Sequence, residues 1–462
     1  SRQIYMQKEV TKSWALFIGI GTIMIAHGLQ MQLMGIRSVV ENFSVITTGI
    51  FMSGYFIGYF LGSNTTPKLV QKVGHIRVFA AFASLASLSA LLAAVYVNPV
   101  MWTLSRFITG ISLVSCYIVT ESWLNDRATN KNRGQLLSAY MIILYSGLGI
   151  GMLLLNISDP TNYEPFILVS VLLSLALVPI LLTKRSAPKF KKIGTISVKE
   201  LYEISPLGTV SSFCTGLIHS AFFSLMAVYA TKANFTLFET SILLFIATMA
   251  GVAFQGPIGY FSDKLDRRKV IVVVTLLSAF FSFLSIIFGS QSLENMYLST
   301  ELSISKILFF IVVGLYAGLC LPLFSLNLAH TNDFVPKEKF VAAGGGLQFI
   351  FGIGAISGPI VCSLFMNWFD INGLFIFLII SHIIIGIFGI YRMKIRAVAE
   401  NPDSTFTPVP ATITPAGLEL DPTAEYIEEP YTEKVKEMLD RKGVKYKKNL
   451  KPSEQTIESE VK

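Results

Sequence analysis

Arg106 and Glu121 are the ionisable residues that stand deepest in the long apolar stretches of this sequence. They lie 15 residues apart, which on one helix is roughly 22 Å along the axis and roughly 60° around it, too far for an ion pair. In a bilayer each charge costs on the order of 2.5–3.5 kcal/mol, so each must face a protein interior, a cavity or a partner. Either residue could bind a solute or relay a proton. The alternative is a structural partner or, for Glu121, a side chain that reaches the membrane interface.

The apolar stretch that carries both residues is one of twelve. The chain is 52% hydrophobic and 14% charged over 462 residues, with a mean hydropathy of +0.60, whereas soluble domains carry roughly 25% charged residues. A bilayer core requires about 20 apolar residues per helix. We therefore expect an all-α integral membrane protein with twelve transmembrane helices. They are predicted near residues 13–34, 46–66, 78–97, 101–124, 134–156, 164–183, 207–230, 238–260, 269–289, 305–328, 340–366 and 372–393.

Motifs for catalysis or for cofactor binding do not occur in a plausible context. The four cysteines, Cys116, Cys214, Cys320 and Cys362, all fall inside predicted helices and lack metal-ligand spacing, so we interpret them as packing residues. No phosphate loop, His/Cys cluster or nucleophile elbow stands between a strand and a helix. We expect no enzymatic activity, no cofactor and no metal site.

The basic residues indicate the orientation of the helices. Of the 37 Lys and Arg residues, only Arg37, Lys232 and Lys306 fall in the loops opposite the N-terminus. Cytoplasmic loops are the ones enriched in Lys and Arg, so both termini should be cytoplasmic. Because this distribution accounts for the net charge of +8, no nucleic-acid partner is expected.

The twelve predicted helices fall into two sets of six. Residues 1–12 form an N-terminal segment, 13–183 and 207–393 the two six-helix bundles, 184–206 a cytoplasmic linker, and 394–462 a polar, Pro-rich cytoplasmic tail. Asn125 with Asp126 ends the fourth helix and Asn332 with Asp333 ends the tenth, which favours two related halves, as in transporters. In the tail we expect no packed core and only one short helix, Tyr431 to Arg441.

Two local motifs resemble signatures of the Major Facilitator Superfamily. The loop after the eighth helix contains Gly259, Asp263, Asp266, Arg267 and Arg268, which resembles the superfamily's Gly, Asp and paired basic residues. In the equivalent loop after the second helix, Gln71 stands where the superfamily usually has aspartate. Arg106, four residues before Gly110, resembles a second signature.

A longer set of segments is similar to the bacterial YcaD-like branch of that superfamily. These segments are Arg106 to Trp123 with Glu121-Ser-Trp, Asn132 to Gly134, Ser138 to Met141, Phe351 to Gly354, and Gly358 with Pro359. The resemblance covers residues 13–393. It implies two six-helix pseudo-repeats around a central cavity, lined by the first, fourth, seventh and tenth helices.

Seven polar residues occur on those four helices and are candidates for a substrate or proton pathway. They are His27, Gln30, Arg106, Glu121, His219, Tyr316 and Asn327. Histidine titrates near neutral pH and could couple proton movement to binding; the alternative for either histidine is a hydrogen-bonded interior residue. Gln30 lies on the same helical face as His27, and a contact between helices explains it equally well.

A second set of residues lies where helices meet the cytoplasm. In the loop motif, Asp263 or Asp266 could accept hydrogen bonds from a neighbouring helix while Arg267 and Arg268 pair with acids, forming a conformational latch. The alternative is that the basic residues only set topology. His330 and Asp333 at the end of the tenth helix are candidates for a gate, or for capping that helix.

Together these features predict a secondary transporter in the bacterial inner membrane, a monomer in contact with lipid. It would move a small organic solute by alternating access, and we expect protons to drive it because no ATP site is present. Arg106 favours a solute with a carboxylate or another acceptor group. The alternative is a membrane receptor or scaffold that has this fold and signals through its tail.

Overall fold

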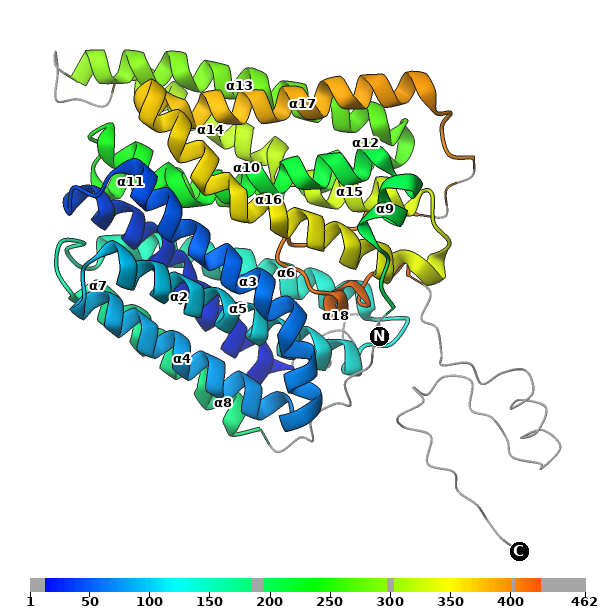
Figure 1. Cartoon of the computed structure of the whole chain (residues 1–462), viewed down its shortest axis with the longest axis horizontal. Helices are drawn as coiled ribbons and strands as arrows, with labels where there is room; N and C mark the ends of the chain where they lie inside the picture. The colour runs from blue at the N-terminus through cyan, green and yellow to red at the C-terminus, as the bar shows by residue number, and fades with distance from the viewer. Residues whose placement is uncertain (1–12, 184–193, 297–302, 401, 403, 425–462) are drawn as a thin grey trace, which may run out of the picture.

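The computed structural model describes residues 13–183, 194–296, 303–400, 402 and 404–424. Its helices form two bundles that lie side by side, one in blue and cyan and the other in green, yellow and orange (Figure 1). Eleven helical stretches of the described chain are long and apolar enough to cross a membrane, and the last of them, Lys337–Ile395, contains two such helices. The prediction of about twelve spanning helices is thus confirmed.

The first bundle contains the helices up to residue 181. They are α2 (Trp14–Val40), α3 (Val45–Val73), α4 (His75–Val95), α5 (Pro99–Arg127), α6 (Arg133–Leu153), α7 (Glu164–Leu175) and α8 (Leu177–Leu181). The second bundle contains α10 (Pro206–Lys232), α11 (Leu237–Ala253), α12 (Gln255–Lys264), α13 (Arg267–Met296), α14 (Ile304–Cys320), α15 (Leu323–Asn332), α16 (Phe340–Phe369) and α17 (Gly373–Ile395). Two short helices lie outside the bundles, α9 (Val198–Ile204) and α18 (Pro415–Leu418).

Proline divides two of the predicted helices. The eighth is interrupted between α11 and α12 beside Pro257, and the tenth between α14 and α15 at Pro322. A proline inside a helix lacks the N–H that would bond to the carbonyl four residues earlier, and its ring clashes with that carbonyl. Each predicted helix therefore becomes two shorter ones joined end to end.

Four helices begin with a polar cap at the same end of the molecule. Ser44, Asn98, Thr236 and Ser303 each accept a hydrogen bond from the backbone N–H three residues later, at 2.9–3.2 Å. Such caps satisfy N–H groups that have no partner inside the helix. We call this the far end, and the opposite end, where residues 404–424 lie, the tail-side end.

Glycines allow the closest approach of helices within each bundle. A Cβ atom on Gly151 of α6 would lie 2.1 Å from the carbonyl oxygen of Ile25 in α2, and one on Gly354 of α16 would lie 2.1 Å from that of Phe213 in α10. The two pairs are the fifth helix on the first and the eleventh on the seventh, so they occupy equivalent places in the two bundles. Between the bundles, α2 contacts α10, α3 contacts α16, and α6 contacts α11.

The segment 404–424 packs between the bundles, which differs from the expectation that no core forms after residue 393. Val409, Ile413, Leu418 and Leu420 are at most 3% exposed, and the segment with α18 lies between the two bundles (Figure 1). The expectation was wrong here because the segment's few apolar residues pack against the helices instead of against one another. The predicted helix from Tyr431 to Arg441 lies outside the described residues.

Two other boundaries differ from those expected. Helix α3 continues to Val73, well past the predicted end at residue 66, because an apolar-residue count marks the bilayer and not the end of the helix. Within the predicted linker, α9 forms because Ser197 caps it through the N–H of Glu200, at 3.2 Å, and because Leu201 is fully buried.

Candidate functional site

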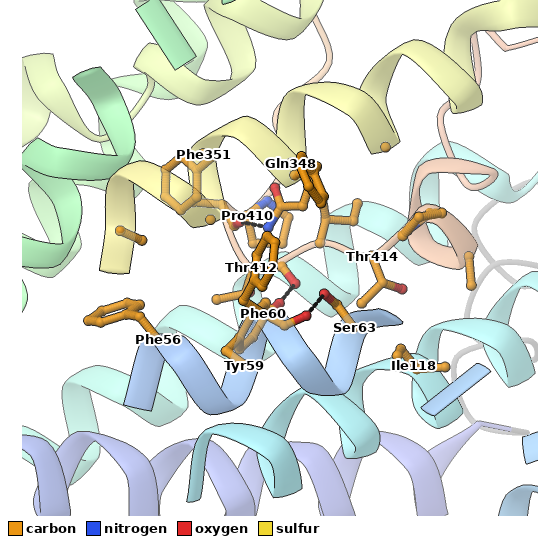
Figure 2. Close-up of a pocket in the computed structure, with 18 of the residues that line it drawn as sticks. Phe56, Tyr59, Phe60, Ser63, Ile118, Gln348, Phe351, Pro410, Thr412 and Thr414 are labelled. Atoms are coloured by element: carbon orange, nitrogen blue, oxygen red, sulfur yellow. Dashed lines mark hydrogen bonds between the residues drawn. The ribbon is translucent and has the colours of Figure 1, made fainter. Parts of the chain in front are cut away.

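A cavity of about 750 Å³ lies between the two bundles. Helices α2, α3 and α6 of one bundle and α10 and α16 of the other form most of its wall, and residues 410–416 form a further part (Figure 2). Most of the wall is aromatic or aliphatic, for example Phe56, Phe60 and Phe351, with a few polar groups among them. This size and composition are typical of sites for small organic molecules.

Tyr55 of α3 links the cavity to Arg106. Its ring stacks on His27, with ring centroids 5.1 Å apart, and the Arg106 guanidinium carbon lies 4.7 Å from the centre of the same ring. Tyr55 and His27 line the cavity, whereas Arg106 is 1% exposed and lies outside the lining. Its Nε and Nη1 have no hydrogen-bond partner among the described residues. The charge thus lies behind the cavity wall, compensated mainly by an aromatic ring.

Glu121 of α5 is fully buried at the tail-side end, where two elements hold its carboxylate. The hydroxyl of Tyr140 in α6 donates to Oε1 at 2.8 Å. The backbone N–H of Thr414 donates to Oε2 at 2.8 Å, and the Thr414 hydroxyl donates to the same oxygen. Both carboxylate oxygens therefore have partners, and one of them is bound only by the C-terminal segment.

The backbone of that segment bonds to side chains from both bundles. Tyr59 of α3 donates to the carbonyl of Thr412, and Gln348 of α16 donates to the carbonyl of Ala411 at 2.7 Å (Figure 2). Ser325 of α15 accepts from the N–H of Val409 at 3.1 Å. Since these residues form no regular structure, helix side chains supply the partners that buried peptide groups require.

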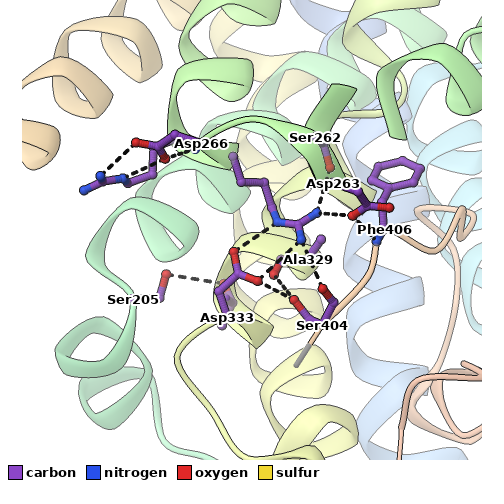
Figure 3. Close-up of polar contacts among 11 residues, drawn as sticks. Ser205, Ser262, Asp263, Asp266, Ala329, Asp333, Ser404 and Phe406 are labelled. Carbon is purple, nitrogen blue, oxygen red and sulfur yellow. Dashed lines mark hydrogen bonds and ion pairs between the residues drawn. The ribbon is translucent and has the colours of Figure 1, made fainter. Parts of the chain in front are cut away.

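A second cluster lies at the tail-side end of α12, α13 and α15. Arg267 pairs with Asp263 at 2.9 Å and with Asp333 at 3.0 Å, and it donates to the carbonyl of Ser404 at 3.2 Å (Figure 3). The Ser404 hydroxyl in turn donates to Asp333. Burial raises the pKa of Asp333, although Arg267 and Ser404 oppose the change. One guanidinium thus joins α12, the start of α13, the end of α15 and the C-terminal segment.

Arg268 makes a separate pair beside it. Its guanidinium donates to Asp266 at 2.9 and 3.1 Å and to the carbonyl of Arg396 at 2.6 Å. Burial opposes ionisation of Asp266, but the hydrogen bonds from Arg268 hold the pKa of that carboxyl below its usual value. These contacts fix the point at which the chain leaves α17.

The sequence as a whole places this chain in a family. A model of the Major Facilitator Superfamily matches residues 16–300 and, separately, residues 209–436. The chain belongs to the Major Facilitator Superfamily. It is therefore a multi-pass membrane protein and an MFS-type transporter, in a superfamily whose members are typically not enzymes.

Curated relatives and solved structures agree with this assignment. The chain is 24% identical over 365 residues to the uncharacterized MFS-type transporter YcaD of Escherichia fergusonii, covering 78% of this chain and 90% of that one, and equally similar to YcaD of Escherichia coli. The nucleoside transporter NupG shares the fold with a TM-score of 0.65 at 14% identity, covering 83% of this chain and 98% of NupG. A bacterial homolog of the human lysosomal transporter Spinster, inward-facing and unoccupied, gives 0.59 at 10% identity, covering 91% of this chain and 99% of the homolog.

Of the seven pathway candidates, His27 and His219 line the cavity, whereas the other five do not. Those five are Gln30, Arg106, Glu121, Tyr316 and Asn327. The expected wall is therefore correct for the first and seventh helices, whereas the fourth contributes only Ile118 and the tenth only Leu321, between α14 and α15. The rest comes from helices not expected there, and α3 covers most of α5. A Cβ on Gly110 of α5 would lie 1.9 Å from the Tyr55 carbonyl oxygen, so α3 packs directly onto α5 and its tyrosines face the cavity.

Tyr316 and Asn327 bond within the second bundle. The Tyr316 hydroxyl lies 3.0 Å from Nε2 of His382, and Asn327 bonds to Ser211 at 2.7 Å and to Thr215 at 3.1 Å. His219 lies 2.9 Å from the carbonyl of Cys320. Gln30 is 1% exposed, and its Nε2 finds no partner in the part of the chain that the structure covers.

The predicted gate residues all lie at the tail-side end, and four of them contact the C-terminal segment: Gly259, Asp263, Arg267 and Asp333. Gly259 faces Phe406 so closely that a Cβ would lie 2.4 Å from its ring, and Asp263 accepts from the Phe406 N–H at 2.8 Å. His330 is buried and packs edge-on against Phe334, with centroids 5.3 Å apart.

The sequence reasoning missed several residues of the site, namely Tyr55, Tyr59, Gln348 and the segment 410–416. One signal for the tyrosines was their spacing of four in an aromatic-rich helix, which places both on one face. For the C-terminal segment, the signal was apolar residues recurring among prolines and threonines from Val409 to Leu420.

Proposed function

We propose that this chain is a secondary transporter that moves a small organic solute by alternating access, coupled to protons. The observation that carries the proposal is a cavity whose wall is divided between the two bundles. When two halves share a site in this way, rocking one against the other exposes the site to each side of the membrane in turn.

The tail-side end is cytoplasmic in this proposal, and the membrane is the bacterial inner membrane. Lys and Arg avoid the far-end loops, apart from Arg37, Lys232 and Lys306, which supports this orientation. The similarity to YcaD of Escherichia supports the location.

The cavity wall favours a neutral or amphipathic solute with an apolar body. Tyr55, Tyr59 and Phe351 offer ring faces, and His27, His219 and Gln348 offer a few hydrogen-bonding groups. Because Arg106 lies behind Tyr55, a carboxylate on the solute would contact it only after that ring moves. A nucleoside has both an aromatic face and polar edges, so nucleosides belong in the first solute panel.

Glu121 is the proposed proton-coupling residue because it is a fully buried carboxylate that bonds to Thr414, which lines the cavity. A buried carboxylate in a membrane protein is costly and marks ion or proton pathways. His27 and His219 are the candidates for passing a proton along the cavity, because both line it.

The test uses purified protein in two assays with one solute panel. Thermal unfolding identifies solutes that bind the folded protein, because a bound ligand raises the unfolding midpoint. Proteoliposomes that contain a pH-sensitive dye then report whether the same solutes move together with protons. We expect one chemical class to score in both assays. A class that raises the midpoint but never enters the vesicles would instead indicate a receptor.

A further inference from the structure

Residues 404–424 dock like a bound peptide ligand in the tail-side opening between the bundles. Val409, Ile413 and Leu420 are at most 1% exposed, as buried as side chains in the helix core. The neighbouring positions Thr405 and Pro422 are exposed. The segment therefore has one face that packs and a few positions that do not.

The docking contacts come from both bundles. Tyr59 and Glu121 of the first bundle bond to Thr412 and Thr414. In the second bundle, Asp263 and Ser325 accept from the N–H groups of Phe406 and Val409, and Gln348 donates to Ala411. A segment bonded to both bundles resists their separation at this end.

The segment also covers the part of the cavity that would be exposed if the two bundles separated at the tail-side end. Residues 410–416 line the cavity between α3 and α16 (Figure 2). One carboxylate oxygen of Glu121, the proposed coupling residue, accepts its hydrogen bonds from the segment, two of them from Thr414. While the segment is docked, that oxygen is not available to a solute or to water.

We propose that residues 404–424 form a plug that binds the chain's own cavity mouth and must leave before the tail-side end can open. The part that enters the cavity mouth, residues 409–414, is an uncharged peptide without helical structure. Tyr59, Gln348 and Glu121 recognise its backbone groups, and Val409 and Ile413 are recognised by burial. The link to transport rests on the proposed function, whereas the docking itself does not.

The experiment measures access to the cavity in the full chain, without any transport. Ile118 of α5 is buried and lines the cavity next to the segment (Figure 2), so Ile118→Cys supplies a thiol that the plug should protect. The protein without this substitution controls for its own four buried cysteines. The readout is the rate of labelling by a water-soluble maleimide.

A second substitution then releases the plug. Ile413→Asp places a charge at a fully buried position, and Thr405→Asp places the same charge at an exposed position of the same segment. We expect Ile413→Asp to speed labelling by at least about tenfold, which corresponds to about 1.4 kcal/mol of docking free energy. Thr405→Asp should leave the rate unchanged.

Adding the plug as a separate peptide distinguishes release of the plug from misfolding of the variant. A synthetic peptide of residues 404–424 should slow labelling of the Ile413→Asp protein in a saturable way, and the same peptide with Ile413→Asp should not. Equal rates in all variants, or fast labelling that the peptide does not slow, would overturn the proposal. Because no solute is involved, a failed transport assay would leave this result unaffected.

Discussion

Glu121 and Arg106 show how differently two buried charges on one helix can be compensated. Glu121 receives three hydrogen bonds from Tyr140 and Thr414. Arg106 has only the ring of Tyr55 over its guanidinium carbon and two nitrogens without partners among the residues described. A movement of Tyr55 would therefore change the surroundings of Arg106 far more than those of Glu121.

Replacing the Glu121 carboxylate should separate coupling from exchange. In Glu121→Gln the side chain can no longer take up and release a proton, so uptake driven by a pH gradient should be lost, while counterflow of a substrate should continue. Proteoliposome flux under the two conditions measures this. Glu203→Gln, an exposed glutamate on α9, is the matched control, and equal loss of both fluxes would refute a role specific to coupling.

Removing Arg267 should destabilise the protein strongly. The Arg267 and Asp333 side chains are 5% and 8% exposed, and breaking such a pair on one side leaves a buried charge, at a cost of about 3–5 kcal/mol. We expect Arg267→Ala to lower the unfolding midpoint in detergent, and Arg267→Ala with Asp333→Asn to recover part of the loss. Lys264→Ala, at an exposed position, should change little. A midpoint for Arg267→Ala equal to that of Lys264→Ala would contradict the role of the cluster.

At the scale of the helices, contact between α3 and α5 depends on two glycines. A Cβ atom on Gly58 would lie 2.0 Å from a carbonyl oxygen of α5, and one on Gly110 would lie 1.9 Å from a carbonyl oxygen of α3, so neither position has room for a side chain. This contact places the tyrosines of α3 in front of α5 and so determines which residues the cavity presents.

A methyl group at Gly110 should force these helices apart. Gly110→Ala would press a Cβ against the Tyr55 carbonyl, and overpacking of this kind costs about 1–3 kcal/mol. Gly256→Ala is the matched control, because Gly256 lies in α12 with no atom near the added Cβ, and alanine is the better helix former by up to about 1 kcal/mol. We expect Gly110→Ala to lower the thermal unfolding midpoint and Gly256→Ala to raise it. A lowered midpoint in both variants would show that alanine is poorly accepted at helix glycines in general, and it would contradict a specific role for the contact between α3 and α5.

The positions of the helices could be predicted from the sequence, but which helices line the cavity could not. Long apolar stretches mark the bilayer, so the twelve spans were predicted near their observed positions. The prolines that divide the eighth and tenth were visible, since Pro257 and Pro322 stand in the sequence. Which face of α3 would cover α5 depended on a contact between two helices, and a single sequence contains no direct record of that contact.

The docked segment is the part of the site that sequence reasoning could least predict. Thr414 and Glu121 are 293 residues apart, and the bond between them uses a backbone N–H that every residue except proline carries. Residue type therefore gave no indication of the partner. Val409 and Ile413 are apolar, but the sequence did not show which surface would bury them, so no packed core was expected there.

For the molecule as a whole, plug docking should depend on pH. Burial raises the pKa of Asp421 above the ordinary 3.8, although Thr423 and Thr407 oppose the change. A carboxyl with a raised pKa favours the docked state at low pH, and this contribution is lost as the pH rises through the raised value. Burial also raises the pKa of Asp333, which lies beside Ser404 of the plug. This carboxyl therefore contributes to docking with the same pH dependence.

Labelling of Ile118→Cys should therefore speed up with rising pH beyond the increase that a free thiol shows. The pH range to compare runs upward from the ordinary pKa of an aspartate. Dividing each labelling rate by the rate for a small thiol at the same pH removes the effect of thiol ionisation and leaves the effect of plug docking. Asp421→Asn should weaken the dependence, because an amide does not titrate, and an unchanged dependence in that variant would exclude Asp421 as its source.

The position of the plug in the chain also orders the assembly of the protein. Residues 404–424 follow α17, so the ribosome makes them after the membrane helices of the described chain. Their docking surface needs α3, α5, α15 and α16 together, so it exists only once both bundles have been inserted and have met. Docking then follows the meeting of the two bundles, and a nascent chain that has its helices but lacks this segment carries an unsealed cavity.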